Sequence, residues 1–184
     1  AQPGTIQWDK NYVGIYDDEA RSIQQTDDGG YIVAGFSESD DGDVSGNNGN
    51  GNFLGNDYWL VKLDASGTLQ WEGNYGGLED DRARSVQQTS DGGYIVAGSV
   101  RGGNRDVSGF NGNSDYWLVK LDSSGTIQWE GCYGGSDYDY GRAVKQTNDG
   151  GYIVAGQSTS DDGDVSVNNG DDDFWVVKLD TSGS

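Results

Sequence analysis

One pattern of apolar and polar positions occurs three times along the chain. A polar stretch, QQT or KQT, leads into an Asp-Gly-Gly turn and then into the apolar run YIVAG. After an acidic, glycine-rich stretch, a second apolar run begins with Asp-Tyr-Trp or Asp-Phe-Trp. The two runs carry the repeated landmarks Tyr31, Tyr94 and Tyr152, and Trp59, Trp117 and Trp175. Internal repetition on this scale indicates an array of similar structural units.

Three repeats account for nearly the whole chain of 184 residues. They span Thr5–Gly67, Thr68–Gly125 and Thr126–Gly183, and the first contains an insertion near Asn50–Asn56. We therefore expect residues 1–184 to form a single repeat domain. The length is sufficient for one domain with a buried core.

Each repeat predicts four short strands, which in the first repeat are Arg21–Thr26, Tyr31–Gly35, Asp57–Asp64 and Thr68–Tyr75. The Asp-Gly-Gly turn is typical of a hairpin, because glycine accepts a positive φ without steric cost. YIVAG is a continuous apolar run, which is typical of a strand covered on both faces. No segment has a sustained helical period, so the predicted fold class is all-β.

Four strands in a repeat of this length are typical of a β-propeller blade. The chain begins with a fourth strand, Thr5–Tyr12, and ends with a third strand, Asp173–Asp180. We expect the amino-terminal strand to complete the last blade and close the ring, which would cover exposed strand edges. Propellers usually have four to eight blades. The alternatives are therefore a tight three-bladed ring, a homodimer that forms a six-bladed ring, and a β-solenoid or β-prism of three sheets.

The motifs TxDGGYIVAG and DYWLVKLDxSG resemble a repeat of bacterial secreted and cell-surface proteins that is usually predicted to be propeller-like. The resemblance covers essentially the whole chain. It implies a secreted or cell-surface location, and it implies no particular activity.

The composition is strongly acidic, with 11 Lys and Arg against 31 Asp and Glu and a formal net charge of -20. Such a surface repels nucleic acid and anionic membranes, and it suits divalent cations and neutral or cationic ligands. Simple solubility is an equally good explanation of the charge. Histidine is absent, which excludes His-dependent triads and makes a zinc enzyme improbable. No stretch is long and apolar enough to span a membrane.

The acidic loop between the second and third strands is a candidate calcium site. Its D-x-D-x-S spacing, with a carboxylate near the twelfth position, supplies the hard oxygen ligands that Ca²⁺ needs. The alternative is a solvated turn in which the side chains bond to the local backbone. The candidate ligands are Asp41, Asp43, Ser45, Asp57, Asn104, Asp106, Ser108, Asp115, Asp162, Asp164, Ser166 and Asp173.

An Asp-x-x-Arg pair precedes or begins the first strand of each repeat. Paired carboxylates could hydrolyse glycosidic bonds, with an arginine keeping one of them ionised. The alternative is a structural ion pair repeated once per blade, because a catalytic centre usually needs one asymmetric arrangement. The candidate catalytic residues are Asp18, Asp81, Asp139, Arg21, Arg84 and Arg142.

Residues that break the repeat are the best candidates for a unique ligand site. The tryptophans recur in every repeat and are expected in the core, whereas several other aromatic residues and two arginines do not recur. Exposed aromatic faces beside carboxylates are suited to holding sugar rings. The candidate ligand-binding residues are Tyr16, Phe53, Phe110, Tyr138, Tyr140, Arg101 and Arg105.

The sequence thus favours a secreted binding module for carbohydrate or another extracellular polymer, supported by calcium. A polysaccharide-degrading glycoside hydrolase that uses paired Asp carboxylates is the first alternative. A structural repeat of a surface adhesin is the second.

Overall fold

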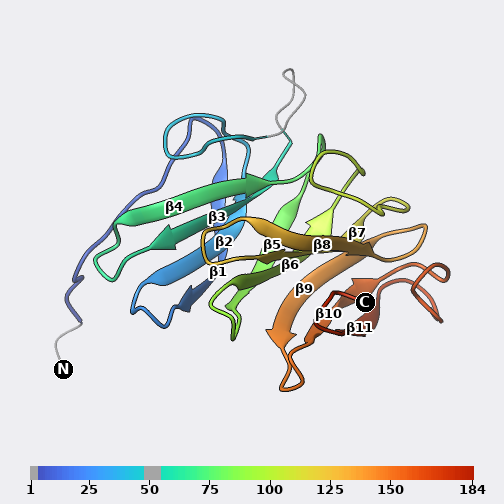
Figure 1. Cartoon of the computed structure of the whole chain (residues 1–184). Coiled ribbons are helices and arrows are strands. Elements are labelled where there is room, and N and C mark those ends of the chain that lie inside the picture. Colours follow the sequence, from blue (N-terminus) through green and yellow to red (C-terminus); the bar gives the residue numbers. More distant parts are fainter. Residues whose placement is uncertain (1–3, 48–54) are drawn as a thin grey trace.

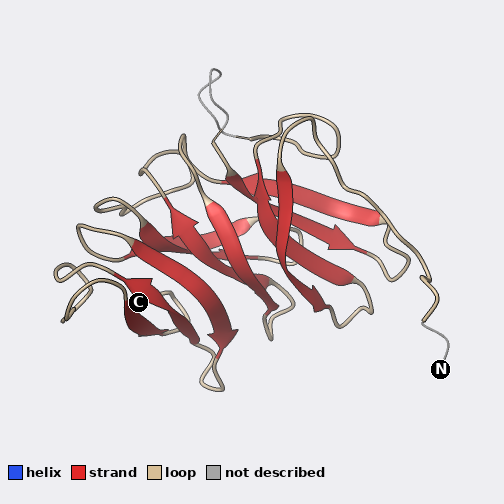
Figure 2. Cartoon of the chain, turned by 180° about the vertical axis from the view of Figure 1, so that it is seen from behind, coloured by secondary structure: helices blue, strands red, loops and turns tan. Residues whose placement is uncertain are grey.

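The computed structural model describes residues 4–47 and 55–184. Throughout these ranges the chain contains strands, turns and loops but no helix, so the all-β prediction is confirmed (Figures 1 and 2). The strands form three antiparallel sheets, each with its strands in sequence order. The first sheet contains β1 (Asp18–Gln25), β2 (Tyr31–Ser37), β3 (Asp57–Leu63) and β4 (Leu69–Tyr75). The second contains β5 (Arg82–Gln88), β6 (Tyr94–Val100), β7 (Asp115–Leu121) and β8 (Ile127–Tyr133), and the third contains β9 (Asp139–Gln146), β10 (Tyr152–Ser158) and β11 (Asp173–Leu179).

The Asp-Gly-Gly turn of each repeat joins the first two strands of a sheet. In the first repeat Asp28 accepts hydrogen bonds from the Thr26 hydroxyl and the Gly30 N–H, and Gly29 has a φ of 83°. The Lys62 ammonium, which is almost fully buried, donates to the same carboxylate at 2.8 Å. The hydrogen bonds from Lys62 and Thr26 hold the pKa of Asp28 well below its usual value. The turn is therefore anchored to the third strand of its own sheet.

Strands β1, β5 and β9 each form one edge of their sheet, and they lie next to one another. We call them the inner strands. Ser22 and Gln24 of β1 accept hydrogen bonds from the backbone N–H groups of Val86 and Gln88 on β5. Ser85 and Gln87 of β5 accept the corresponding bonds from Val144 and Gln146 of β9. Side chains of one repeat thus satisfy backbone groups on the free edge of the next.

Between consecutive sheets the core is built from repeated aromatic contacts. The Tyr58 ring lies 4.6 Å from that of Trp117, and its hydroxyl donates to the Trp117 carbonyl at 3.1 Å. Tyr116 makes the same contacts with Trp175, at 4.6 Å and 3.0 Å. The middle sheet is consequently buried on both faces, and every residue of β6 and β7 is buried.

The segment Thr5–Tyr12 does not complete the third sheet. It forms no strand, and it lies against the first sheet, where the Trp8 ring contacts Tyr31 and the Tyr12 hydroxyl donates to the Gly67 carbonyl. The third sheet has three strands, and the two ends of the chain lie at opposite sides of the molecule (Figures 1 and 2). The prediction that this segment closes the last blade of its own chain is therefore wrong. Segment 5–12 packs on the first sheet as β4 and β8 pack on the sheet that follows them, but no third strand of the described residues lies beside it.

Candidate functional site

Each inner strand carries a β-bulge, and the extra residue of each bulge is an arginine. In β1 the pairing with β2 passes from Ala20 to Ser22, so that Arg21 is the unpaired residue. The register shifts in the same way around Arg84 in β5 and around Arg142 in β9. A bulge bends its strand and changes the direction of a side chain. The repeated bulge therefore sets the position of three arginines on adjacent strands.

A glycine faces each bulge, and the close approach of the two strands requires it. A Cβ on Gly35 would lie 1.8 Å from the Glu19 carbonyl oxygen. A Cβ on Gly98 would lie 2.0 Å from the Arg82 carbonyl oxygen, and a Cβ on Gly156 would lie 2.0 Å from that of Tyr140. The final glycine of YIVAG is thus the residue that makes room for the bulge.

The arginines gather around one cavity of about 240 Å³ on the inner strands of the second and third sheets. Four of the six arginines in the sequence line it. Arg21 lies close to them, and its guanidinium and that of Arg82 both lie over the Phe36 ring. The cavity is lined by Asp80, Arg82, Arg84, Ser99, Arg101, Tyr140 and Arg142. Most of the arginine of a strongly acidic protein is therefore concentrated at one place.

The positive charge of this arginine cluster is only partly neutralised. Arg21 pairs with Glu19 at 2.7 Å and Arg82 with Asp80 at 3.5 Å. Over the described ranges, neither Arg84 nor Arg142 forms a salt bridge. Burial, followed by repulsion from Arg142, Arg21 and Arg82, lowers the pKa of Arg84 below its usual value. An anion in the cavity would relieve this repulsion.

One donor in the cluster has no acceptor in the protein. The Nε atom of Arg82 is buried, and it has no hydrogen-bond partner among the described residues. A buried N–H of a charged group is costly when it is left unsatisfied. This unsatisfied donor belongs to a residue that lines the cavity, and it is a second feature, besides the positive charge, that favours a hydrogen-bond acceptor at the cluster.

Aromatic rings lie beside the guanidinium groups. Arg142 lies over the Tyr140 ring at 5.6 Å from its centre, and Tyr138 is stacked with Tyr140 at 6.1 Å with an interplanar angle of 18°. A side-chain hydrogen bond with Tyr140 raises the pKa of Arg101 above its usual value. Tyr138 is 42% exposed, so this tyrosine pair offers an accessible ring at the side of the cavity.

Three of the predicted ligand-binding residues come together here: Arg101 and Tyr140, which line the cavity, and Tyr138, which stacks on Tyr140. Tyr16 is exposed in the loop before β1, where its N–H donates to Ser39. Phe110 packs against the hydrophobic core, and Arg105 has a positive φ of 55° in the loop after β6. Phe53, with the rest of residues 48–54 of the predicted insertion, lies outside the described residues.

Sequence reasoning missed Arg82, although a signal for it was present. Arg82 occupies the position of Glu19 in the first repeat and of Tyr140 in the third, so it breaks the repeat as Tyr140 does. A search for cations at positions where the other repeats differ would have found it.

The candidate catalytic aspartates organise loops, and among the described residues none of them forms an ion pair with the arginine of its motif. Asp18, Asp81 and Asp139 accept hydrogen bonds from the backbone N–H groups of residues 14, 77 and 135, at 2.7, 2.6 and 2.8 Å. Asp81 and Asp139 are fully buried. Burial, with the nearby charges of Asp57 and Asp80, raises the pKa of Asp81 to about 8. These carboxylates hold the loop that precedes each inner strand.

The carboxylates of the acidic loops are also engaged with backbone N–H groups. Asp41 and Asp43 accept bonds from residues 15 and 13, at 2.8 and 3.0 Å. Asp106 and Asp164 accept bonds from residues 76 and 134, and Asp162 accepts one from residue 136. These are the bonds expected of the alternative reading, in which the loop is held by its own side chains.

The remaining candidate calcium ligands are distributed over several environments. The hydroxyls of Ser45 and Ser108 donate to Glu72 and Glu130 on the fourth strands. Asn104 lies in the loop after β6 and Ser166 is exposed in the loop after β10. Asp57 and Asp115 are buried at the start of the third strands, and Asp173 is exposed at the start of β11. Throughout 4–47 and 55–184, no three acidic, Cys or His side chains are grouped so that they could hold a metal ion.

The chain is similar over most of its own length to part of a bacterial regulatory protein. No protein-family model matches the chain. Over 168 residues the chain is 28% identical to the regulatory protein FlaEY of Caulobacter vibrioides. The alignment covers 86% of this chain and 17% of that protein, so the chain spans less than a fifth of the relative's length. In the described ranges, no helix is long and apolar enough to cross a membrane.

Proposed function

We propose that the protein is a binding module for an anionic carbohydrate or a similar anionic extracellular polymer. The observation that carries the proposal is the arginine cluster around a single cavity, in a chain whose net charge is -20. A protein that needed cations only for solubility would distribute them over its surface.

The chemistry of the cavity suits a carboxylate or sulfate group. A guanidinium presents a planar set of donors that matches these groups in a bidentate manner, and it binds them more specifically than an ammonium does. Arg84 and Arg142 lie on adjacent inner strands, so two forks reach one cavity. The stacked pair Tyr138 and Tyr140 adds an apolar ring face beside the charges, as a sugar ring requires.

The arginine cluster changes the expectation that follows from composition. The net charge favours neutral or cationic ligands, but charge acts locally once a ligand is within about a Debye length of the site. We expect the acidic exterior to repel anionic polymers at long range and the cluster to hold them at short range. Salt would then weaken both effects, so the affinity would fall less steeply with salt than it does for a wholly basic protein.

We also infer that the three sheets are consecutive blades of a β-propeller. The antiparallel strand order, the adjacent inner edges and the face-to-face packing of sheets support this interpretation. In a propeller the inner strands line the axis, so the arginine cluster would lie along it. The extracellular location implied by the repeat motifs, and the support by calcium, stay predictions.

The proposal is tested by affinity electrophoresis in gels that contain polygalacturonate, a sulfated polysaccharide or neutral dextran. We expect retardation by at least one anionic polymer and none by dextran. Retardation by dextran alone, or by none of the three, would refute the proposal.

A matched pair of variants separates the site from net charge. Arg84→Gln removes one charge from the cavity and should weaken binding at least about 10-fold, since charge-assisted hydrogen bonds contribute about 1.5–3 kcal/mol. Arg105→Gln removes the same charge from a residue that does not line the cavity and should leave binding unchanged. Equal effects of the two variants would show a non-specific dependence on charge. Arg84→Lys keeps the charge, and a partial loss would identify the contribution of the planar fork.

A further inference from the structure

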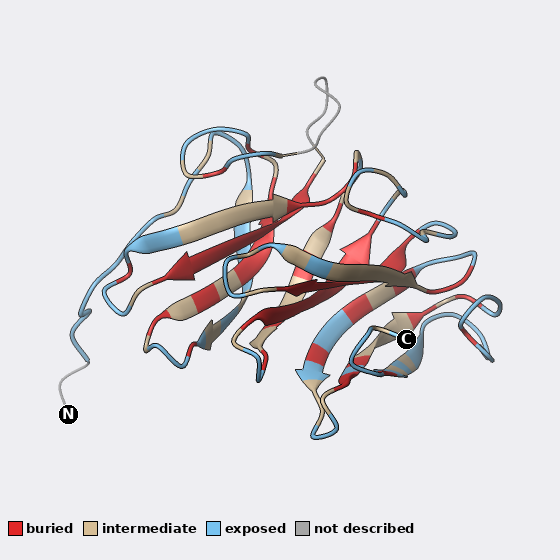
Figure 3. Ribbon diagram, in the orientation of Figure 1, coloured by how far each residue is buried: buried red, intermediate tan, exposed pale blue. Residues whose placement is uncertain are grey.

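The outer face of the third sheet exposes apolar side chains that are buried in the other two sheets. Phe174 is 97% exposed, whereas its counterparts Tyr58 and Tyr116 are fully buried. Val176 is 58% exposed and Ile153 39% exposed, although their counterparts in the first and second sheets have no exposed surface. Figure 3 shows the middle sheet largely buried and several exposed stretches on the third. We call this surface, which Phe174, Val176 and Ile153 form, the tail face.

The opposite face of the first sheet has the complementary property, and we call it the head face. Ile23 is 65% exposed, whereas its counterparts Val86 and Val144 are 5% and 1% exposed. Ala20 is exposed, whereas its counterpart Ala83 is fully buried beneath the first sheet. The head face therefore presents the surface that the second and third sheets use to receive the preceding sheet.

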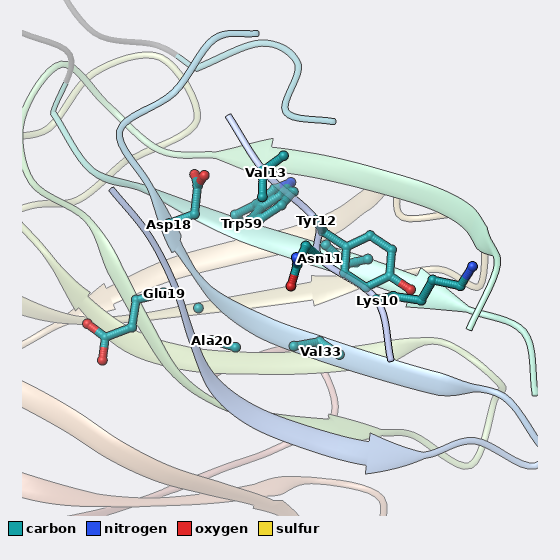
Figure 4. A pocket seen from close by; sticks show the side chains of 11 residues that line it. Lys10, Asn11, Tyr12, Val13, Asp18, Glu19, Ala20, Val33 and Trp59 are labelled. Carbon is teal, nitrogen blue, oxygen red and sulfur yellow. The ribbon is translucent and has the colours of Figure 1, made fainter. Parts of the chain in front are cut away.

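A pocket lies on the head face at the position where an aromatic ring is received elsewhere. The pocket has a volume of about 270 Å³, and Gly35, Trp59 and Tyr12 line it (Figure 4). At the two internal contacts, the rings of Tyr58 and Tyr116 pack against Trp117 and Trp175, the counterparts of Trp59. Their hydroxyls lie against Gly98 and Gly156, the counterparts of Gly35. An aromatic side chain of the same kind therefore fits this pocket.

In the described part of the chain the third sheet has three strands, and a stretch similar in sequence to a fourth strand lies at residues 5–12. Residues 5–12 read TIQWDKNY, and β4 and β8 lie within the similar stretches TLQWEGNY and TIQWEGCY. β4 pairs along β3 with Tyr75 opposite Tyr58, and β8 pairs along β7 with Tyr133 opposite Tyr116. In the same register Tyr12 would lie opposite Phe174, and the open edge of β11 would gain a strand.

We propose that the tail face of one chain docks on the head face of a second copy of the chain. Phe174 enters the pocket at Gly35 and Trp59 of the second copy, whose segment 5–12 lies along β11 as its fourth strand. The same contact repeated by the second copy on the first gives a closed pair of two-fold symmetry. The proposed contact continues the pattern of the two internal interfaces, and it does not depend on anion binding.

Side-chain partners support this register. The Trp59 indole donates to Glu72 at 3.1 Å and the Trp117 indole to Glu130 at 2.8 Å, each on the neighbouring fourth strand. The corresponding acceptor for Trp175 is Asp9 of the second copy. Lys62 and Lys120 donate to Gln70 and Gln128, and the corresponding partner of Lys178 is Gln7.

The docked interface lacks several hydrogen bonds of the internal ones. Phe174 has no hydroxyl to match the bond from Tyr58 to the Trp117 carbonyl. Ala143 and Lys145 replace the serine and glutamine that cap the next inner strand in the other repeats. The association is therefore weaker than the contact between sheets of one chain, and it depends on protein concentration.

The oligomeric state tests the proposal directly. Sedimentation velocity over a dilution series should show a species of twice the 19.7 kDa chain mass that dissociates on dilution. A monomer at every concentration would overturn the proposal, and so would a dimer that persists in the face variants described next.

Two variants with complementary defects identify the faces. Phe174→Asp damages the tail face and Ile23→Asp the head face, and each should weaken self-association at least about 30-fold, as loss of a central interface residue does. Both side chains are exposed, so the fold of each monomer is retained, which circular dichroism checks. A mixture of the two variants still offers one intact contact, so dimers should return on mixing. Absence of dimers in the mixture would overturn the head-to-tail arrangement.

Ser123→Asp is the matched control. It adds the same charge to an exposed turn of the middle sheet, outside both faces, and should leave the association unchanged. Loss of the dimer in this variant would show that net charge controls the association, and the proposal would then fail.

Discussion

The glycine opposite the middle bulge is predicted to support both the fold and the candidate site. We consider Gly98→Ala, which adds one methyl group to β6. The added Cβ would lie 2.0 Å from the Arg82 carbonyl oxygen and 2.7 Å from the Tyr58 hydroxyl. Real Cβ atoms do not approach a neighbour closer than 3.0 Å, so β5 and β6 must separate by roughly 1 Å. The obstacle is backbone, which has little freedom to yield.

The expected cost is about 2–4 kcal/mol of unfolding free energy, above the usual overpacking range because backbone is displaced. Urea unfolding measures it. Gly92→Ala is the matched control: Gly92 has a φ of 83° but nothing lies within 4 Å of its Cβ position. The control should therefore lose only the roughly 1 kcal/mol of a left-handed alanine.

The same variant should also lose binding of an anionic polymer, because the bulge sets the position of Arg84. Without urea, and at a temperature where both variants are folded, Gly92→Ala should bind the polymer as the unmodified protein does. If Gly98→Ala were as stable as the unmodified protein, the steric argument would be wrong. If it were destabilised but bound normally, the bulge would not be what positions the arginines.

Three further predictions concern the acidic groups. Burial raises the pKa of Asp81 to about 8, so the folded state binds this proton more tightly than the unfolded chain does. The free energy of unfolding should therefore decrease by a few kcal/mol as the pH rises from about 4 to about 8. Asp81→Asn should flatten a plot of melting temperature against pH. Calcium support of the acidic loops predicts a lower melting temperature after chelation, and an unchanged value would exclude it. A glycoside hydrolase would release new reducing ends from a polysaccharide, and release that persists when Asp18, Asp81 and Asp139 are all changed to Asn would remove these residues from catalysis.

The strands and hairpin turns could be predicted because their signals are local. Asp-Gly-Gly, YIVAG and the Trp-centred run each determine their own conformation, and the three occurrences reinforce one another. The same repetition predicted all six tryptophans in the core. Trp59 and Trp117 are buried, and Trp71, Trp129 and Trp175 are half-buried against the core, but the prediction is wrong for Trp8, which is 39% exposed. Local chemistry and repetition together were sufficient for the fold class and the order of the strands.

The site could be predicted only in part, and the position of the amino-terminal segment could not be predicted, because both depend on relations between strands. A bulge is a mismatch between two paired strands, so nothing in the sequence around Arg21 or Arg84 indicates it. The net charge did not indicate the arginine cluster, because it sums the charges of the whole surface. The segment 5–12 resembles the fourth strands in sequence, but it forms no strand itself, because sequence similarity does not specify whether a third strand lies beside it.

Each sheet packs on its immediate neighbours, and this determines the order in which the sheets unfold. An array of this kind behaves as a one-dimensional chain of units, in which a terminal unit has one stabilising contact and an internal unit has two. In the monomer, unfolding should therefore begin at the third sheet, where the described residues place neither a fourth strand nor a covering sheet on β11, and should reach β6 and β7 last. Amide hydrogen exchange would record this as a gradient of protection that rises from the carboxyl end towards the centre of the sequence.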